Sequence, residues 1–296
     1  MSHANRPAWM GRPSRLTTAA KGIAITVIVA LMVFPMWVVL ATSFAPAEEV
    51  VANGGFVIWP SDWTSGTYER IFAAGMVPRA LLVSLGVTLV GTALSLVLTI
   101  GLAYGLSRPA VFGGKPVLLM VLFTFLMPAG MIPLFLVVQG TGLLNTFGAL
   151  FAPMLLSAFN LIVMRGFFQS VPSELIEAAK IDGAGELRIL LRLVLPLSKA
   201  VIAVVGLFYA VSYWNNFFNG VIYLDDSSMW PMATLLRSFT SGGLSVADAT
   251  GEAGSQIAPV SVQMAVVVLA TVPILVVYPF VQRFFVKGVL TGAVKA

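Results

Sequence analysis

The sequence predicts an all-α, polytopic membrane protein with six transmembrane helices. Hydrophobic residues make up 58% of the 296 residues, charged residues make up 10%, and the mean hydropathy is +0.96. An average soluble domain has roughly 25% charged residues. Long uncharged stretches recur along the chain, and a helix needs about 20 predominantly apolar residues to span a bilayer. These stretches are 22–47, 80–107, 116–164, 200–224 and 253–282.

Six spans divide the chain into membrane and connecting segments, with a membrane domain over 22–285. The spans are expected at about 22–43, 80–107, 116–138, 144–165, 199–222 and 257–284. The connecting segments are a tail at 1–21, an outer segment at 44–78, an inner loop at 166–198, an outer loop at 223–256 and a tail at 286–296. In the long third stretch Pro128 and Pro133 are expected as kinks, because neighbouring helices can satisfy the freed backbone groups.

Two segments carry side chains that suit these surroundings. The second span holds small residues that let helices approach closely. They are Ser84, Gly86, Gly91, Thr92, Ser95 and Gly101. The outer segment holds Trp59, Trp63 and Tyr68, and aromatic rings at such a place favour anchoring at the membrane interface.

The positive charges predict that both termini lie in the cytoplasm, because Lys and Arg near span ends stay on that side. Of the 17 Lys and Arg residues, only Arg70, Arg79 and Arg237 then fall outside. The net charge of +5 and the pI of 9.7 therefore reflect topology and not nucleic-acid binding. A cleaved signal peptide ending near Ala45-Pro46-Ala47 is the competing interpretation of the first span. That span, about 22 residues, exceeds the apolar core of a typical signal peptide.

Several kinds of functional residue are missing. The uncharged stretches hold none of the ionisable groups with which a proton-driven pump works. No phosphate-binding loop is present, because Gly114-Lys115 is followed by Pro116. The chain has no cysteine, and its one histidine is His3, so we expect no catalytic residue, metal site or bound cofactor. An ion- or proton-coupled carrier and a membrane-embedded enzyme are alternatives that these absences disfavour.

A charged segment between the fourth and fifth spans is the most distinctive feature. Its charges are Glu174, Glu177, Lys180, Asp182, Glu186, Arg188 and Arg192. Pro172-Ser173 predicts a helix start with Ser173 as the N-cap, followed by acids that suit the helix dipole. Ala178 and Ala179 leave a bare surface for a partner, and Asp182-Gly183 predicts the turn that ends the helix. An ordinary amphipathic interfacial helix would explain the charges but not the whole spacing.

The same residues resemble the EAA loop of ABC-importer permeases, whose short helix docks in a groove of the cytoplasmic ATPase. The matching blocks are Glu177-Ala178-Ala179, Asp182-Gly183-Ala184 and Leu195-Pro196. The resemblance implies the type I ABC-importer permease fold. The implied docking residues are Glu174, Glu177, Ala178, Ala179, Asp182, Gly183, Ala184, Leu195 and Pro196. Two positions depart from the family pattern, since Leu190 replaces a common Phe and Ala200 a usual Pro.

Further blocks narrow the resemblance to carbohydrate permeases of the maltose-permease type. They are 42–44, 102–108, 171–175 and 214–215. Trp230-Pro231 and the ending 278–288 are similar to permeases for oligosaccharides of complex polysaccharides, including pectin fragments and alginate. The resemblance thus implies a multi-pass subunit of the bacterial inner membrane that imports an oligosaccharide by alternating access. An acidic oligosaccharide is one candidate, although the apolar stretches hold no Arg or Lys to pair with it.

The resemblance also implies the partners. They are a second permease subunit in a heterodimer, two cytoplasmic ATPase subunits and an extracytoplasmic sugar-binding protein, around the lipid bilayer. ATP and Mg would be used by the ATPase subunits, and this chain would be a non-catalytic subunit that binds no cofactor.

The fifth span and the loop after it hold candidate ligand contacts. Sugars need stacking rings together with amide donors and acceptors. The substrate-pathway candidates are Tyr213, Trp214, Asn215, Asn216, Phe217 and Asn219, with Gln139 as a more isolated one. An aromatic girdle with Asn side chains bonded between helices explains each of them equally well. By resemblance, the loop 223–256 contacts the binding protein, although a plain solvated loop fits its composition as well. The contact candidates are Asp225, Asp226, Trp230, Gly242 and Gly243.

Overall fold

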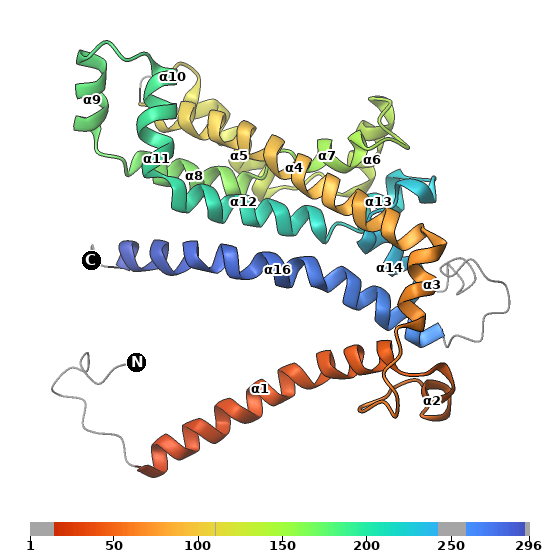
Figure 1. Ribbon diagram of the computed structural model, residues 1–296. Coiled ribbons are helices and arrows are strands. Elements are labelled where there is room, and N and C mark those ends of the chain that lie inside the picture. The colour runs from red at the N-terminus through yellow and green to blue at the C-terminus, as the bar shows by residue number, and fades with distance from the viewer. Residues whose placement is uncertain (1–14, 110, 242–258, 294–296) are drawn as a thin grey trace. The chain divides into compact units, whose positions relative to one another are not determined.

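A computed structural model describes residues 15–109, 111–241 and 259–293, and these residues form helices without strands (Figure 1). The first helices are α1 (Arg15–Phe44), α2 (Ala47–Ala52), α3 (Gly66–Ala74), α4 (Met76–Ser107), α5 (Gly114–Leu126), α6 (Met131–Gly140), α7 (Gly148–Phe151), η2 (Ala152–Met154) and α8 (Ala158–Gln169). The others are α9 (Ser173–Ile181), α10 (Glu186–Ile189), η3 (Leu190–Val194), α11 (Leu195–Leu197), α12 (Lys199–Trp214), α13 (Phe218–Tyr223), η4 (Ser227–Met229), α14 (Met232–Thr240) and α16 (Pro259–Ala293).

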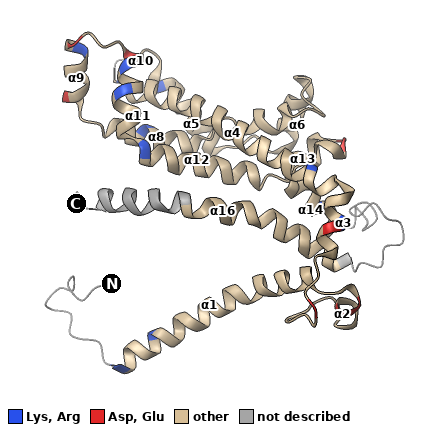
Figure 2. Cartoon of the chain, viewed as in Figure 1, with Lys and Arg blue, Asp and Glu red and all other residues tan. Residues whose placement is uncertain are grey.

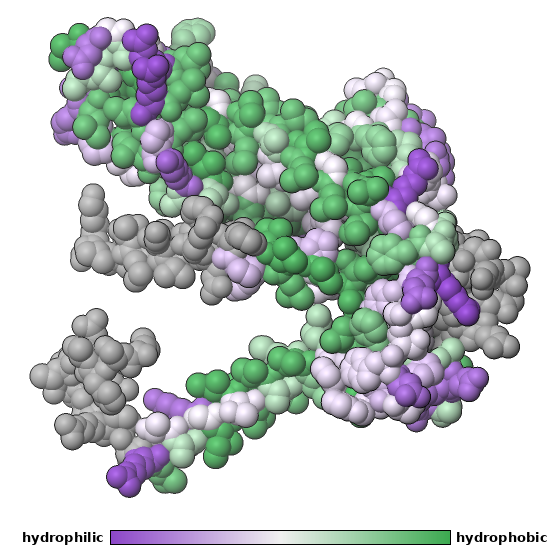
Figure 3. All heavy atoms as spheres, in the orientation of Figure 1, coloured by the Kyte–Doolittle hydropathy of each residue, from purple (hydrophilic) through white to green (hydrophobic). Residues whose placement is uncertain are grey.

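Among the described residues, three helices are long and apolar enough to cross a membrane. They are α1, α4 and the part of α16 from Val260 to Pro279. Two bent helix pairs, Gly148–Met154 with Ala158–Gln169 and Glu186–Leu197 with Lys199–Trp214, raise the number to five if each pair is one span. Apolar side chains cover much of the exposed surface (Figure 3), as expected where helices meet lipid or partner subunits. The number of six spans remains a prediction.

The chain divides into two compact units, one within Met1–Tyr68 and Gln256–Val268, the other within Glu69–Ser255 and Leu269–Ala296. In the first unit the predicted outer segment folds back on the end of α1. Thr42 Oγ1 accepts a hydrogen bond of 3.0 Å from Val57 N. Tyr68 OH donates to Ser43 Oγ at 2.8 Å. The end of α1 is thereby tied to the chain that follows it.

Three tryptophans of the first unit lie together. The ring centroids of Trp37 and Trp59 are 5.6 Å apart, and Trp63 lies 6.1 Å from each. Trp37 Nε1 also donates to Ile58 O at 2.9 Å. Trp59 and Trp63 are anchoring candidates from the sequence, whereas Trp37, which connects them to α1, is not among those candidates. Their anchoring at a membrane interface remains a prediction.

The second unit is organised around α4, which packs against α12, α8 and α5 (Figure 1). The buried face of α4 is lined mainly by small residues at helical spacing. They are Ala80, Ser84, Val87, Gly91, Ser95, Thr99 and Ala103. The prediction of a small-residue face is confirmed for Ser84, Gly91 and Ser95. Thr92 is partly buried. Gly86 and Gly101 are exposed and do not belong to this buried face, because the 3.6-residue period places them on the other side of the helix.

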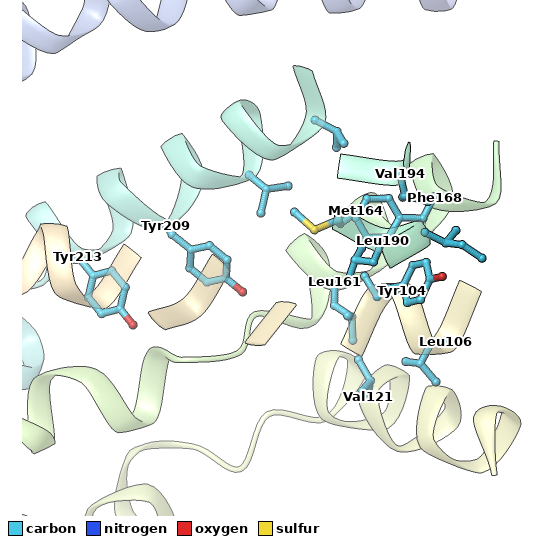
Figure 4. Close-up of a cluster of buried hydrophobic side chains, with 14 of the residues drawn as sticks. Tyr104, Leu106, Val121, Leu161, Met164, Phe168, Leu190, Val194, Tyr209 and Tyr213 are labelled. Atoms are coloured by element: carbon cyan, nitrogen blue, oxygen red, sulfur yellow. The ribbon is translucent and has the colours of Figure 1, made fainter. Parts of the chain in front are cut away.

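Two tyrosines of α12 fit against this face. The Tyr213 hydroxyl lies 2.9 Å from Ser95 Oγ, and the Tyr209 hydroxyl lies 2.7 Å from Thr99 Oγ1. Tyr209 OH also accepts from Ser157 N at 2.9 Å, just before α8. Both tyrosines are 2% exposed, and Figure 4 shows their rings directed from α12 toward α4. These polar groups therefore satisfy one another inside the bundle, where an unpaired group would cost free energy.

Several expected helices are interrupted. The helix expected at 116–138 is two helices, α5 and α6, separated at 127–130. Pro128 lacks an amide hydrogen and disfavours a helical backbone at the residue before it, and Gly130 has a φ of 82°. Pro128 thus lies in a full break rather than a kink. The helix expected at 144–165 is α7, η2 and α8, with a 52° bend. The one expected at 199–222 breaks after Trp214 and resumes as α13.

The boundaries of the connecting segments also differ from expectation. Helix α1 starts at Arg15 and α16 continues to Ala293, so part of each predicted tail is helical. Pro273 and Pro279 lie inside α16. The predicted outer loop contains η4 and α14, and Met232 N donates to Ser84 Oγ at 2.7 Å. The described part of that loop is therefore folded against α4.

We predict that Gly91→Ala destabilises the protein, whereas Gly86→Ala does not. A Cβ at Gly91 would lie 2.7 Å from Cζ of Tyr213, while one at Gly86 meets nothing within 4 Å. Both variants gain the same helix propensity, so their difference isolates packing. Overpacking costs about 1–3 kcal/mol, which should lower the thermal unfolding midpoint in detergent. Equal midpoints for the two variants would contradict close packing of α4 and α12.

Candidate functional site

The charged segment forms α9, with ends that its sequence explains. Its N-cap position is Pro172, and no side chain caps it. The predicted Ser173 N-cap is therefore wrong, because Pro172 supplies the extended backbone at the boundary and Ser173 is already the first helical residue. Glu174 lies in the first turn and Lys180 in the last, where the helix dipole favours each charge.

The predicted turn at Asp182-Gly183 is present. Gly183 has a φ of +76°, its N–H donates to Lys180 O at 3.0 Å, and Ala184 N donates to Ala179 O at 2.9 Å. These two bonds form a Schellman motif, which satisfies the last carbonyl groups of a helix. Glycine suits this position because other residues rarely adopt a positive φ.

Most of the surface of α9 is exposed. Ile176 is its one buried residue, and Ala179 packs partly against the hydrophobic core. Figure 1 shows α9 standing clear of α4, α8 and α12, and Figure 2 shows charges along it. Leu175 is 45% exposed and Ile181 is 87% exposed. These two apolar residues are not among the candidates predicted from the sequence, although their helical phase, away from Ile176, indicates that they face outward.

After α9 the chain enters the core through α10, η3 and α11. Ile189, Leu190 and Val194 are buried, and in Figure 4 the last two lie near Phe168 and Tyr104. This helical stretch meets α12 at an angle of 85°. Of the two remaining docking candidates, Leu195 is partly buried and Pro196 is exposed. The candidates at 174–184 therefore form one segment, exposed except for the partly buried Ala179 and Ala184, and Leu195 and Pro196 lie apart from it, next to the bend.

Glu186 is the centre of a polar cluster that the sequence analysis did not predict. Its Oε1 lies 2.8 Å from Lys180 Nζ, and its Oε2 accepts from Tyr104 OH at 2.5 Å. Arg108 Nε lies 3.9 Å from the same Oε2. The hydrogen bond from Lys180, and then that from Tyr104, lowers the pKa of Glu186. The carboxylate therefore stays ionised at neutral pH.

The substrate-pathway candidates are divided between buried and exposed positions. Tyr213 and Trp214 are buried, and Trp214 Nε1 donates to Ala270 O at 3.2 Å. Asn216 Oδ1 accepts from Asn219 N at 3.2 Å, so these two share a local bond. The remaining three, Asn215, Phe217 and Gln139, are exposed. Gln139 lies on α6, and the structure does not gather all seven into one site.

The binding-protein candidates lie beside a second loop. Asn145 Oδ1 accepts hydrogen bonds of 3.2 Å from the backbone N–H groups of Asp225 and Asp226. Both acids are exposed. The hydrogen bonds from Ser228, with a smaller contribution from Arg79, lower the pKa of Asp226. Trp230 is partly buried. Gly242 and Gly243 lie outside the described residues.

No group of three or more His, Cys, Asp or Glu side chains within the described parts of the chain is arranged to hold a metal ion. The exposed acids and apolar side chains of α9 are suited to contact with another protein. The amides near the end of α12 are suited to polar, uncharged contacts.

Comparisons with known proteins agree with this architecture. A family described as the binding-protein-dependent transport system inner membrane component matches residues 8–291. The polygalacturonan/rhamnogalacturonan transport system permease protein YtcP of Bacillus subtilis is 45% identical over 267 residues, which are 90% of this chain and 93% of that protein. The LplC protein of Bacillus subtilis is 44% identical over 269 residues, 90% of each chain.

A solved structure shares the fold. It is a chain of a bacterial ABC transporter involved in the import of the acidic polysaccharide alginate. The TM-score is 0.85 at 26% identity, over 94% of this chain and 100% of that one. The predicted all-α ABC-importer permease fold is thereby confirmed. The chain belongs to the family of inner-membrane permease components of binding-protein-dependent ABC transport systems.

Proposed function

We propose that this permease moves an oligosaccharide into the cytoplasm as one half of a heterodimeric membrane domain. Two ATPase subunits would hydrolyse ATP with Mg, and an extracytoplasmic sugar-binding protein would deliver the cargo. The chain itself would catalyse no reaction. In this proposal six spans place both termini in the cytoplasm. Family membership favours this function over an ion- or proton-coupled carrier or a membrane enzyme.

The exposed helix α9 is the observation that carries the proposal. It presents acids, the small side chain of Ala178 and the apolar side chains of Leu175 and Ile181, while only Ile176 is buried. Exposed apolar side chains rimmed by charges are typical of protein interaction sites. We therefore assign ATPase docking to α9. We add Leu175 and Ile181 to the docking residues that were predicted from the sequence.

The covalent path from α9 into the membrane domain supports alternating access. The Schellman turn at Gly183 leads to α10 and η3, whose Ile189, Leu190 and Val194 are buried in the core. Packed cores shift between discrete arrangements rather than deforming continuously. Movement of α9 by the ATPases would therefore displace α10–α11 and α12 together, and the sugar would cross without chemical change.

An acidic oligosaccharide is the proposed cargo. YtcP is named for polygalacturonan and rhamnogalacturonan, and the structural neighbour takes part in alginate import. The exposed Asn215 at the end of α12 would offer amide contacts to sugar hydroxyl groups. Asp225, Asp226 and Trp230 are the proposed contacts with the binding protein.

Replacement of Ala178 by Trp is expected to weaken ATPase association. Ala178 is exposed on α9, so the ring would block close approach without disturbing the core. We expect the affinity for the ATPase subunit to fall at least about tenfold, or about 1.4 kcal/mol, in co-purification or titration with the cognate ATPase. Ala73→Trp, at an exposed alanine of α3, is the matched control. Unchanged ATPase binding in Ala178→Trp would argue against docking through α9.

Asn215→Ala and Tyr213→Phe should affect different properties, the first the KM of uptake and the second the stability. Tyr213 is 2% exposed and bonded to Ser95. Tyr213→Phe removes the hydroxyl and this hydrogen bond. It should therefore lower the stability by about 0.6 kcal/mol, as for other interhelical hydrogen bonds in membranes, and leave the KM of uptake unchanged. Asn215→Ala should raise that KM severalfold with an unchanged unfolding midpoint. If neither variant alters KM, the end of α12 is not part of the substrate pathway.

The proposed cargo can be tested by uptake into cells that lack or carry this chain together with its cognate partners. Labelled trigalacturonate should accumulate only in cells that carry the chain, and an excess of neutral galactotriose should not compete. Equal competition by galactotriose would overturn the assignment of an acidic substrate. It would leave the assignment as an oligosaccharide permease intact.

A further inference from the structure

We propose that Glu186 is a positioning residue that couples α9 directly to the end of α4 and exchanges its cationic partner during transport. This inference rests on the proposed docking of α9 to the ATPase. It adds a path to α4, because the covalent connections of α9 lead back to α8 and onward through α10 and η3 to α12. Figure 2 shows that several charged residues lie in and around α9, α10 and α11.

The contacts of Glu186 join three helices. Its carboxylate receives Lys180 Nζ of α9 at 2.8 Å and Tyr104 OH of α4 at 2.5 Å, while Glu186 itself begins α10. Tyr104 OH also lies 3.2 Å from the Glu186 backbone oxygen. Hydrogen bonds to an ionised group are about twice as strong as neutral ones. Displacing α9 therefore pulls on α4 through this carboxylate.

Few other contacts hold α9 to the bundle. Ile176 is its one buried residue and Ala179 is partly buried. The Lys180–Glu186 pair is thus the charged attachment of a helix that is otherwise held by its two ends and a small apolar contact. An exposed ion pair contributes little to stability, so Glu186 is better suited to direct movement than to hold the fold together.

Arg108 supplies a second partner for Glu186. It is the C-cap residue of α4, its Cζ lies 4.4 Å from the centroid of the Tyr104 ring, and its Nε lies 3.9 Å from Glu186 Oε2. This Nε is buried and has no hydrogen-bond partner among the described residues. Leaving a buried donor unpaired costs about 1–3 kcal/mol, more when it is charged.

The two cations define two arrangements. In this structure Glu186 is hydrogen-bonded to Lys180 and forms a long ion pair of 3.9 Å with Arg108, without a hydrogen bond between them. When the ATPases draw α9 and Lys180 away, the carboxylate can close on Arg108 Nε, which gains the hydrogen bond that it lacks here. Such a bistable element, biased by α9 at one side and by α4 at the other, meets the physical requirement for coupling between distant sites.

The chain has no cysteine, so introduced cysteines can be labelled selectively and the distance between them measured by pulsed electron–electron double resonance. Spin labels would be placed at Ser173→Cys on α9, an exposed residue outside the proposed docking set, and at Phe112→Cys just beyond α4, which is 104% exposed. The sample is the full transporter in nanodiscs, with and without a non-hydrolysable ATP analogue. We expect a narrow distance distribution that shifts with nucleotide, and in Glu186→Gln a broader one that does not shift.

Transport supplies the second readout. In proteoliposomes with trigalacturonate and the binding protein, Glu186→Gln should hydrolyse ATP at a rate close to that of the unmodified transporter. It should move about tenfold less sugar per ATP and bind the ATPase normally. The matched control is Glu48→Gln, an exposed residue of α2, and it should change neither quantity. Lys180→Met, at a side chain that is 52% exposed, tests the same link if Glu186→Gln does not assemble.

The outcomes separate this inference from the proposed function. A Glu186→Gln transporter with normal distances and normal sugar per ATP would overturn the coupling role. A parallel loss of stability, ATPase binding and hydrolysis would also overturn it, because a merely structural residue would act in that way. Failure of the unmodified chain to bind the ATPase would instead refute docking itself, and failure to move trigalacturonate would refute only the cargo.

Discussion

The close approach of α4 and α12 is the interaction on which the second unit depends. Helices in lipid gain no hydrophobic free energy by associating, so packing and interhelical hydrogen bonds must hold them. Here the small face of α4 accepts the rings of Tyr209 and Tyr213, and Ser95 and Thr99 bond their hydroxyls. Tyr209 also accepts the Ser157 N–H at the start of α8. One side chain thereby fixes three helices, and Gly91 leaves the space that the arrangement needs.

The position of α9 follows from this fixed bundle. Because α12 is held against α4, the 85° bend before it sets the direction of α10–α11, whose apolar side is buried in the same core. The Schellman turn at Gly183 then determines how α9 leaves that stretch. Helix α9 is thus exposed on nearly all sides but attached to packed elements at both ends, as the proposed transmission of movement would require.

The sequence was most informative where structure is locally determined. Uncharged stretches predicted α1, α4 and α16, and Asp182-Gly183 predicted the end of α9, because apolar length and turn chemistry depend on near neighbours. The full break at 127–130 escaped prediction, since proline in membranes causes either a kink or a break according to its tertiary surroundings. The cluster at Glu186 escaped it too, because Tyr104 lies 82 residues away in the chain and no local pattern pairs the two.

The interruption between α12 and α13 bears on how an acidic sugar would be recognised. A break at membrane depth is tolerated only where its backbone groups find partners or line a cavity. Here Phe217 O accepts from Thr234 Oγ1 at 3.1 Å, and Asn216 Oδ1 accepts from Asn219 N. These groups are therefore already used. Asn215 is exposed near the break; its Nδ2 donates to Val211 O at 2.9 Å, and its Oδ1 has no hydrogen-bond partner among the described residues. A single amide can distinguish hydroxyl groups but cannot neutralise a uronate, so recognition of an acidic cargo would need further groups besides Asn215.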